Sequence, residues 1–187
     1  MEPFIRDGTH LRTGRPFKRL GGMRSREALA NWLLCVTVNA VDQRKLTFSS
    51  DPTGGDGIIH DEASGDTWLT EHVYIPPRSA ADSRDLKALI LDAIEQKRSK
   101  GGHAYASGKT LVVFLDAGTG MWFPNRVARE LPQPLHFEAV WAVGLQGVSE
   151  GVYTYGVTLL DATEGDAPTY IVCISVDFDL WEVIIIQ

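Results

Sequence analysis

The chain has 187 residues, 44% of them hydrophobic and 22% charged, which is the composition of an ordinary globular protein with one sizeable core. No stretch approaches the roughly 18 consecutive apolar residues that a membrane-spanning helix needs, and the polar N-terminus lacks the apolar core of a signal peptide. The net charge of −6 argues against a protein that coats nucleic acid through bulk electrostatics. We therefore expect a cytoplasmic protein without a membrane partner, and an oligomer is possible.

The charge is distributed unevenly between the N-terminus and the rest of the chain. Residues 1–26 carry seven Lys or Arg against two acids, so the remainder is strongly acidic. Residues 1–23 are rich in Gly, Pro and Arg and have no sustained period, which predicts an irregular basic arm, whereas residues 24–187 are expected to form one domain. A basic arm on an acidic body could bind phosphates while the body holds metal ions. The alternative is that the arm is only a solvated tail.

A helix is predicted directly after the arm. Ser25 can serve as its N-cap, and Glu27 falls in its first turn, where a negative charge is favourable. Apolar residues then recur on a broad face, and the helix should end near residues 41–44. Residues 45–50 are expected to form a short extended segment, after which the Gly and Pro of DPTGGDG indicate a turn.

Two β-type segments follow, at residues 56–61 and 66–75, and the four residues 62–65 join them. If the residues on either side of that loop close it, the register of the hairpin is fixed. In this register Asp56 lies directly opposite Glu71, on a face that also carries apolar residues.

The remaining elements alternate between the two kinds of period. Apolar residues recur at helical spacing over residues 82–99, with two glycines just past the end, which predicts a second helix. Residues 110–115 include the wholly apolar run LVVFL, which is typical of a central strand covered on both faces. Four more strands are expected, at residues 137–145, 152–160, 170–176 and 180–186. This order of elements predicts an α/β domain.

Asp56 and Glu71 are the residues that point to chemistry. Placed opposite each other, the two carboxylates would stand about 5 Å apart at Cβ and would repel each other unless a cation lay between them. Mg²⁺ or Mn²⁺ would resolve that conflict, because each is a hard ion that takes carboxylate oxygens. We therefore predict a divalent-metal site at this pair.

The two acids and the order of elements resemble the PD-(D/E)XK nucleases of restriction-endonuclease-like fold. In that family one Asp begins a hairpin, as Asp56 does in GGDGII, and an acid follows on the second strand, as Glu71 does in WLTEHVY. The resemblance covers roughly residues 25–116 and implies a mixed central sheet flanked by helices. It also implies metal-assisted hydrolysis of phosphodiester bonds in DNA, with Asp56, Glu71 and the backbone carbonyl of His72 holding the ion.

The sequence departs from the family two positions after Glu71, where the family usually has Lys and this chain has Val73. A valine cannot orient or deprotonate water. Lys97 is the natural replacement, because it continues the apolar stripe of the second predicted helix, and Gln96 beside it could also face the site. The alternative is that Lys97 only extends along the surface or interacts with the helix C-terminus. Glu27 on the first helix is a possible supplementary acid.

Three functions are compatible with these residues. The first is a Mg²⁺-dependent nuclease acting on DNA, in which Asp56, Glu71, Lys97 and Gln96 take part in catalysis. The second is a catalytically inactive relative that binds nucleic acid or a protein partner, which the missing Lys and the acidic body favour. The third is a protein whose hairpin acids are solvated and whose resemblance to nucleases is accidental.

Overall fold

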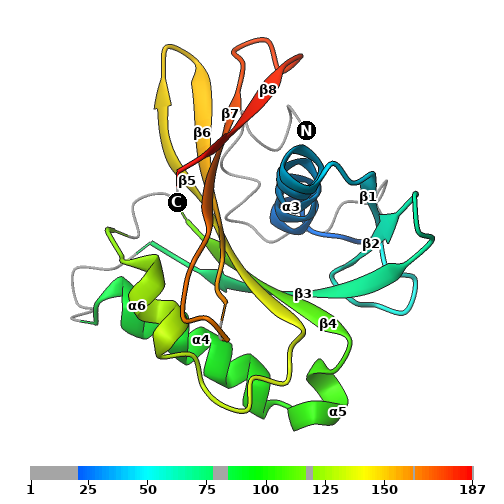
Figure 1. Cartoon of the computed structure of the whole chain (residues 1–187), viewed down its shortest axis with the longest axis vertical. Helices are drawn as coiled ribbons and strands as arrows, with labels where there is room; N and C mark the ends of the chain where they lie inside the picture. The colour runs from blue at the N-terminus through cyan, green and yellow to red at the C-terminus, as the bar shows by residue number, and fades with distance from the viewer. Residues whose placement is uncertain (1–20, 78–83, 117–119, 162, 187) are drawn as a thin grey trace.

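The computed structural model describes residues 21–77, 84–116, 120–161 and 163–186. Its elements are α3 (Ser25–Asp42), β1 (Leu46–Ser49), β2 (Gly57–Asp61), β3 (Thr67–Ile75), α4 (Leu86–Ser99), α5 (Gly102–Ala106), β4 (Lys109–Leu115), α6 (Pro124–Arg129), β5 (Ala139–Ser149), β6 (Val152–Leu159), β7 (Thr169–Ile174) and β8 (Trp181–Ile185). The eight described strands form one sheet in chain order (Figure 1). Strands β3, β4 and β5 are parallel, and the other neighbouring pairs are antiparallel. The protein is therefore α/β with a mixed sheet flanked by helices, as predicted.

Helix α3 occupies the concave face of the curled sheet. It packs against β1, β2 and β4 and also against β6, β7 and β8, and Figure 1 shows it between the two ends of the sheet. Leu29, Leu33 and Val157 are fully buried in this layer. Burial of an aliphatic side chain contributes roughly 1.5–3 kcal/mol, so packing is the main force that holds α3 in place.

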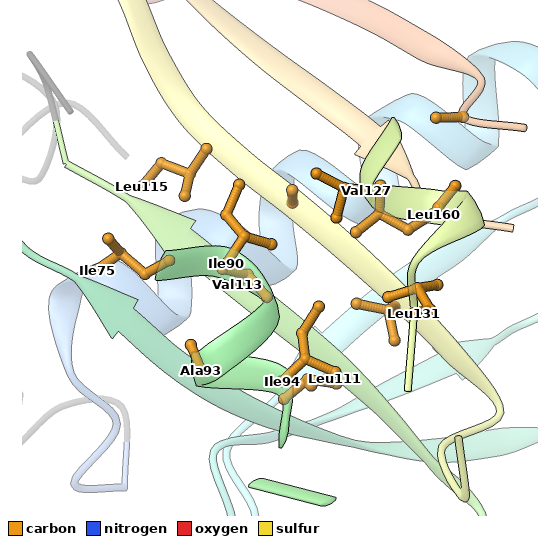
Figure 2. Packing of buried hydrophobic residues seen from close by; sticks show 14 of the residues in the cluster. Ile75, Ile90, Ala93, Ile94, Leu111, Val113, Leu115, Val127, Leu131 and Leu160 are labelled. Carbon is orange, nitrogen blue, oxygen red and sulfur yellow. The ribbon is translucent and has the colours of Figure 1, made fainter. Parts of the chain in front are cut away.

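Helices α4 and α6 cover the opposite face of the sheet. Ile90 and Ile94 of α4 and Val127 of α6 are fully buried in one cluster with Leu111 and Val113 of the central strand β4 (Figure 2). Alternate residues of β4 belong to the two layers, with Val113 on this side and Val112 on the α3 side. The run LVVFL thus forms a central strand covered on both faces, and that prediction is confirmed.

The β2–β3 hairpin has the register expected from its loop length. Ile58 pairs with Leu69, and the backbone N–H of Asp61 donates to the carbonyl of Asp66 at 2.9 Å to close the loop. The Asp61 carboxylate also accepts a hydrogen bond from the Arg44 guanidinium at 2.6 Å, which ties the loop to the segment after α3. This register brings the residue before β2 alongside the middle of β3, where the two predicted acids lie.

The starts of both long helices differ from the sequence-based expectations. Ser25 is the first residue of α3, and Arg24 takes the N-cap position. The Glu27 carboxylate accepts a hydrogen bond from the Arg24 backbone N–H at 2.7 Å, so the cap uses the acid and not the serine. Helix α4 begins at Leu86, later than predicted, because the Asp85 side chain accepts a backbone N–H of the first turn. No periodic pattern predicts the short helices α5 and α6.

The last four strands occur where they were expected, with ends that differ by a few residues. Residues 1–20, most of the predicted basic arm, lie outside the described residues. Within the described part of the chain, no helix combines the length and the apolar composition needed to cross a membrane.

Candidate functional site

The candidate site is an open cleft of about 460 Å³ beside the first half of β3. Its walls also come from the turn before β2, the C-terminal end of α4, helix α5 and the first residue of β4. Its charged lining consists of three acids, Asp51, Asp56 and Glu71, and four bases, Arg24, Lys97, Lys100 and Lys109. The predicted pair of acids and the predicted lysine therefore share one cleft.

Asp56 is held in place by two different elements. Its carboxylate Oδ2 accepts a hydrogen bond from the backbone N–H of His72 at 2.7 Å, and its backbone carbonyl accepts one from Asn31 Nδ2 at 3.2 Å. Burial raises the pKa of the Asp56 carboxyl, and the His72 N–H opposes that rise. The nearby charges of Glu27 and Glu71 raise the pKa further. A cation beside Asp56 would favour its ionised form.

The imidazole of His72 belongs to the support of the site and lies apart from the two carboxylates. Its Nε2 is 3.1 Å from Oδ1 of the fully buried Asn31, on the α3 side of the sheet. Because Asn31 Nδ2 donates to the Asp56 carbonyl, Oδ1 is the acceptor for His72, so we assign the proton to Nε2. Burial lowers the pKa of His72 to about 3, which keeps the ring neutral. Among the described residues, its Nδ1 has no hydrogen-bond partner.

The backbone of His72 is oriented toward the acids even though its ring is not. In a strand the N–H and C=O of one residue point to the same side. Since the His72 N–H donates to Asp56, the His72 carbonyl also points toward the start of β2. This carbonyl, and not the imidazole, is the group that could join the carboxylates as a metal ligand.

Glu71 forms an ion pair with Lys97 from α4. Lys97 Nζ donates a hydrogen bond to Glu71 Oε1, and only 20% of the Lys97 side chain and 12% of the Glu71 side chain are exposed. Burial opposes ionisation of Glu71, but the hydrogen bond from Lys97 and the nearby Tyr105 hydroxyl outweigh it, so the pKa of Glu71 is lowered. The prediction that Lys97 approaches the acid pair is confirmed.

Tyr105 of α5 gathers two more lysines at the other side of the cleft. Lys100 Nζ and Lys109 Nζ lie 4.9 Å and 4.2 Å from the centre of the Tyr105 ring, within cation–π range. The Tyr105 hydroxyl is buried and completes no hydrogen bond within the part of the chain that the structure describes. Burial and then the Glu71 carboxylate raise the pKa of this phenol, so it stays protonated.

Two other predicted residues do not join the acid pair. Gln96 is exposed and is not among the residues that line the cleft. Glu27 is buried, and its carboxylate accepts hydrogen bonds from the backbone N–H and the guanidinium of Arg24 at 2.7 Å and 2.9 Å, so it influences Asp56 only through its charge.

Val73, in the usual Lys position, packs among apolar residues. Within residues 21–77, 84–116, 120–161 and 163–186, no group of three His, Cys, Asp or Glu could hold a metal ion.

Sequence reasoning missed Tyr105, Lys100, Lys109 and Asp51. The signal that could have indicated the first three is the placement of three lysines around one tyrosine between residues 97 and 109. Asp51 shapes the turn before β2, because its carboxylate accepts hydrogen bonds from the backbone N–H and the hydroxyl of Thr53 at 2.8 Å and 2.7 Å.

The arrangement places two acids in one cleft, supplies a lysine to one of them and adds three further basic side chains to the lining. Such a site can hold a phosphate ester next to a hard cation. Comparison of the chain with protein-family models, with curated proteins and with solved structures gave no match.

Proposed function

We propose that this chain is a Mg²⁺-dependent nuclease that hydrolyses phosphodiester bonds in DNA, built as a variant of the restriction-endonuclease-like fold. The observation that carries the proposal is the ion pair between Lys97 and Glu71. It supplies from α4 the cation that the PD-(D/E)XK motif usually places two residues after the second acid. Val73, which occupies that place here, packs in the apolar layer instead.

The donor set suits Mg²⁺ better than a metal that needs an all-protein cage. Mg²⁺ is commonly bound through one or two carboxylates, with water and substrate phosphates completing its shell, so two acids are a sufficient protein contribution. Asp56, Glu71 and the backbone carbonyl of His72 would hold the ion. When bound, it would polarise the scissile phosphate and lower the pKa of an attacking water.

The residues of the chain have separate tasks in this reaction. Lys97 keeps Glu71 ionised. Its ammonium would stabilise the negative charge that develops on a phosphate bound beside Glu71. Asn31 and the His72 N–H fix Asp56 from two directions, so the carboxylate keeps one orientation toward the cleft. The neutral, buried His72 ring serves this positioning and does not accept the proton of the water.

The test compares Mg²⁺-dependent cleavage of single-stranded, double-stranded and branched DNA by the wild type and three variants. Lys87→Ala is the matched control for Lys97→Ala, because Lys87 lies on the same helix and forms a 2.8 Å ion pair with Glu130 instead of Glu71. We expect Glu71→Ala and Lys97→Ala to lose cleavage by about 100-fold or more, in the range for removal of one transition-state contact. Lys87→Ala should cleave like the wild type.

Equal activity in all four proteins would point to a contaminating nuclease and end the proposal. Cleavage lost in Glu71→Ala but kept in Lys97→Ala would retain the nuclease and reject Lys97 as its cation.

A second candidate is a catalytically inactive relative that binds nucleic acid or a protein partner through the same cleft. It is favoured by the neutralisation of Glu71 by Lys97, which reduces the electrostatic demand for a metal ion. Binding of DNA by the wild type that needs no Mg²⁺ and leads to no cleavage would select this function over the first.

A further inference from the structure

Lys100 and Lys109 are two charges of the cleft that the proposed reaction does not use. Both ammoniums lie against the ring of Tyr105, at 4.9 Å and 4.2 Å from its centre. Lys100 directly follows α4 and Lys109 begins β4, so they come from different elements. The tertiary structure, and not adjacency in the sequence, brings the two charges together.

Like charges gathered around one ring repel each other unless an anion lies between them. Among the described residues, neither lysine has an acidic partner in an ion pair. The hydrogen bonds of the nearby acids go elsewhere, because Glu71 pairs with Lys97 and Asp51 accepts from Thr53 and the turn. Lys109 acts on these two acids only through its charge. This side of the cleft therefore favours an anionic ligand.

We propose that Lys100 and Lys109, held by Tyr105, bind a phosphate of a nucleic-acid strand next to the phosphate that is cleaved at Asp56 and Glu71. The proposal rests on the proposed function for the identity of its ligand. Phosphate chemistry fits because each ammonium has three N–H donors, and the cation–π contact leaves donors free for phosphate oxygens.

The register of the sheet sets the separation between this subsite and the acids. Lys109 pairs with Leu69 of β3, and Glu71 lies two residues further along the same strand. Two strand residues span about 7 Å, which is on the scale of the step from one phosphate to the next along a nucleic-acid strand. The substrate class that follows is an oligonucleotide or polynucleotide strand, because a nucleoside monophosphate has no second phosphate to occupy the subsite.

The test measures binding of a fluorescent single-stranded oligonucleotide to the full chain by anisotropy at several salt concentrations. One oligonucleotide carries a 5′-hydroxyl and a second carries a 5′-phosphate, and Ca²⁺ replaces Mg²⁺ so that binding is measured without cleavage. For single strands each phosphate contact contributes about 0.7 to the slope of log K against log salt concentration. We expect Lys100→Ala and Lys109→Ala each to weaken binding several-fold and to flatten the slope by about that amount. Lys87→Ala, outside the cleft, should change neither quantity.

Tyr105 is a positioning residue in this proposal, and its role has its own readout. Tyr105→Leu removes the ring that holds both ammoniums and should lose more affinity than Tyr105→Phe, which keeps the ring. Equal losses in these two variants would assign the effect of Tyr105 to its hydroxyl and overturn the positioning role.

The outcomes separate the subsite from the nuclease. A flattened slope with both oligonucleotides assigns the subsite to a backbone phosphate, and a flattened slope with only the 5′-phosphorylated one assigns it to a strand end. Slopes for Lys100→Ala and Lys109→Ala that match Lys87→Ala overturn the subsite, even if Glu71→Ala abolishes cleavage. Flattened slopes without any cleavage by the wild type keep the subsite and remove the nuclease.

Discussion

Replacing Asn31 with Ala tests whether α3 supports Asp56. Asn31 is fully buried and makes two hydrogen bonds, one from Nδ2 to the Asp56 carbonyl at 3.2 Å and one between Oδ1 and His72 Nε2 at 3.1 Å. Ala at this position removes both. Each buried group left without a partner costs about 1–3 kcal/mol, so we expect the free energy of unfolding to fall by roughly 2–6 kcal/mol.

Urea unfolding followed by tryptophan fluorescence measures this change. Asn39→Ala is the matched control, because the Asn39 amide also holds a strand from α3, through the N–H and carbonyl of Leu46 at 2.6 Å and 3.0 Å. Leu46 is not a cleft residue. Both variants should therefore unfold at lower urea concentrations, but under conditions where both are folded only Asn31→Ala should lose DNA cleavage.

Two results would refute this reasoning. If Asn31→Ala lowered the free energy of unfolding by less than about 0.5 kcal/mol, as an ordinary surface substitution does, the two hydrogen bonds would not stabilise the position of Asp56. Full cleavage by a clearly destabilised Asn31→Ala variant would mean that Asp56 keeps its position without α3.

Two further predictions concern the hairpin. Gly57→Ala should lower the melting temperature more than Gly54→Ala. Both glycines have positive φ, at 152° and 94°, but of the two only Gly57 is crowded, since an added Cβ would lie 2.3 Å from Asn31 Nδ2. Similar melting temperatures for the two variants would contradict this prediction. Asp61→Asn should be less stable than the wild type at neutral pH, because backbone N–H groups of the loop and a guanidinium lower the pKa of the Asp61 carboxyl. The stabilisation by the ionised Asp61 carboxyl is fully present above the ordinary pKa of an Asp and is lost as the pH falls through the lowered pKa. The difference in free energy of unfolding between the wild type and Asp61→Asn should therefore shrink in acid, and a difference that stays constant would contradict this prediction.

The hairpin register and the place of Lys97 could be predicted because both follow from regular local geometry. A four-residue loop and strict alternation leave one register, and the pairing of Ile58 with Leu69 obeys it. Successive residues of a helix are rotated by about 100°. Lys97 continues the inward stripe and reaches the cleft, whereas the adjacent Gln96 is turned away from it and is exposed.

The basic side of the cleft could not be predicted in the same way. Helix α5, which carries Tyr105, has five residues and is too short to show a period. Lys109 reaches the cleft only because β4 pairs in parallel with β3. No turn fixes the register of a parallel pair, since the connection runs through a crossover whose packing is decided by the whole core. The acids are thus a local feature of the sequence, and the lysines around Tyr105 are a tertiary one.

Val73 allows the lysine to be moved between its two possible positions. Val73 is half-buried and, by strand alternation, lies on the same face of β3 as Glu71, packed against the α4 layer. A lysine there could direct its ammonium back along the strand to Glu71, because its stem is long and flexible. In Val73→Lys alone, two ammoniums would compete for one carboxylate beside apolar residues, so we expect this variant to be less stable than the wild type.

The double variant Val73→Lys/Lys97→Ala removes that competition and leaves one lysine for Glu71. Its free energy of unfolding should therefore be higher than the value expected from adding the two single losses. The difference should be about 0.5–3 kcal/mol, the range for residues that interact. Urea unfolding of the wild type, the two single variants and the double variant measures this coupling energy. Cleavage regained by the double variant relative to Lys97→Ala would mean that the charge beside Glu71 matters more than the element that supplies it. Strictly additive losses would mean that a lysine in place of Val73 does not reach Glu71, and the relocation of the cation to α4 could then not be reversed by one substitution.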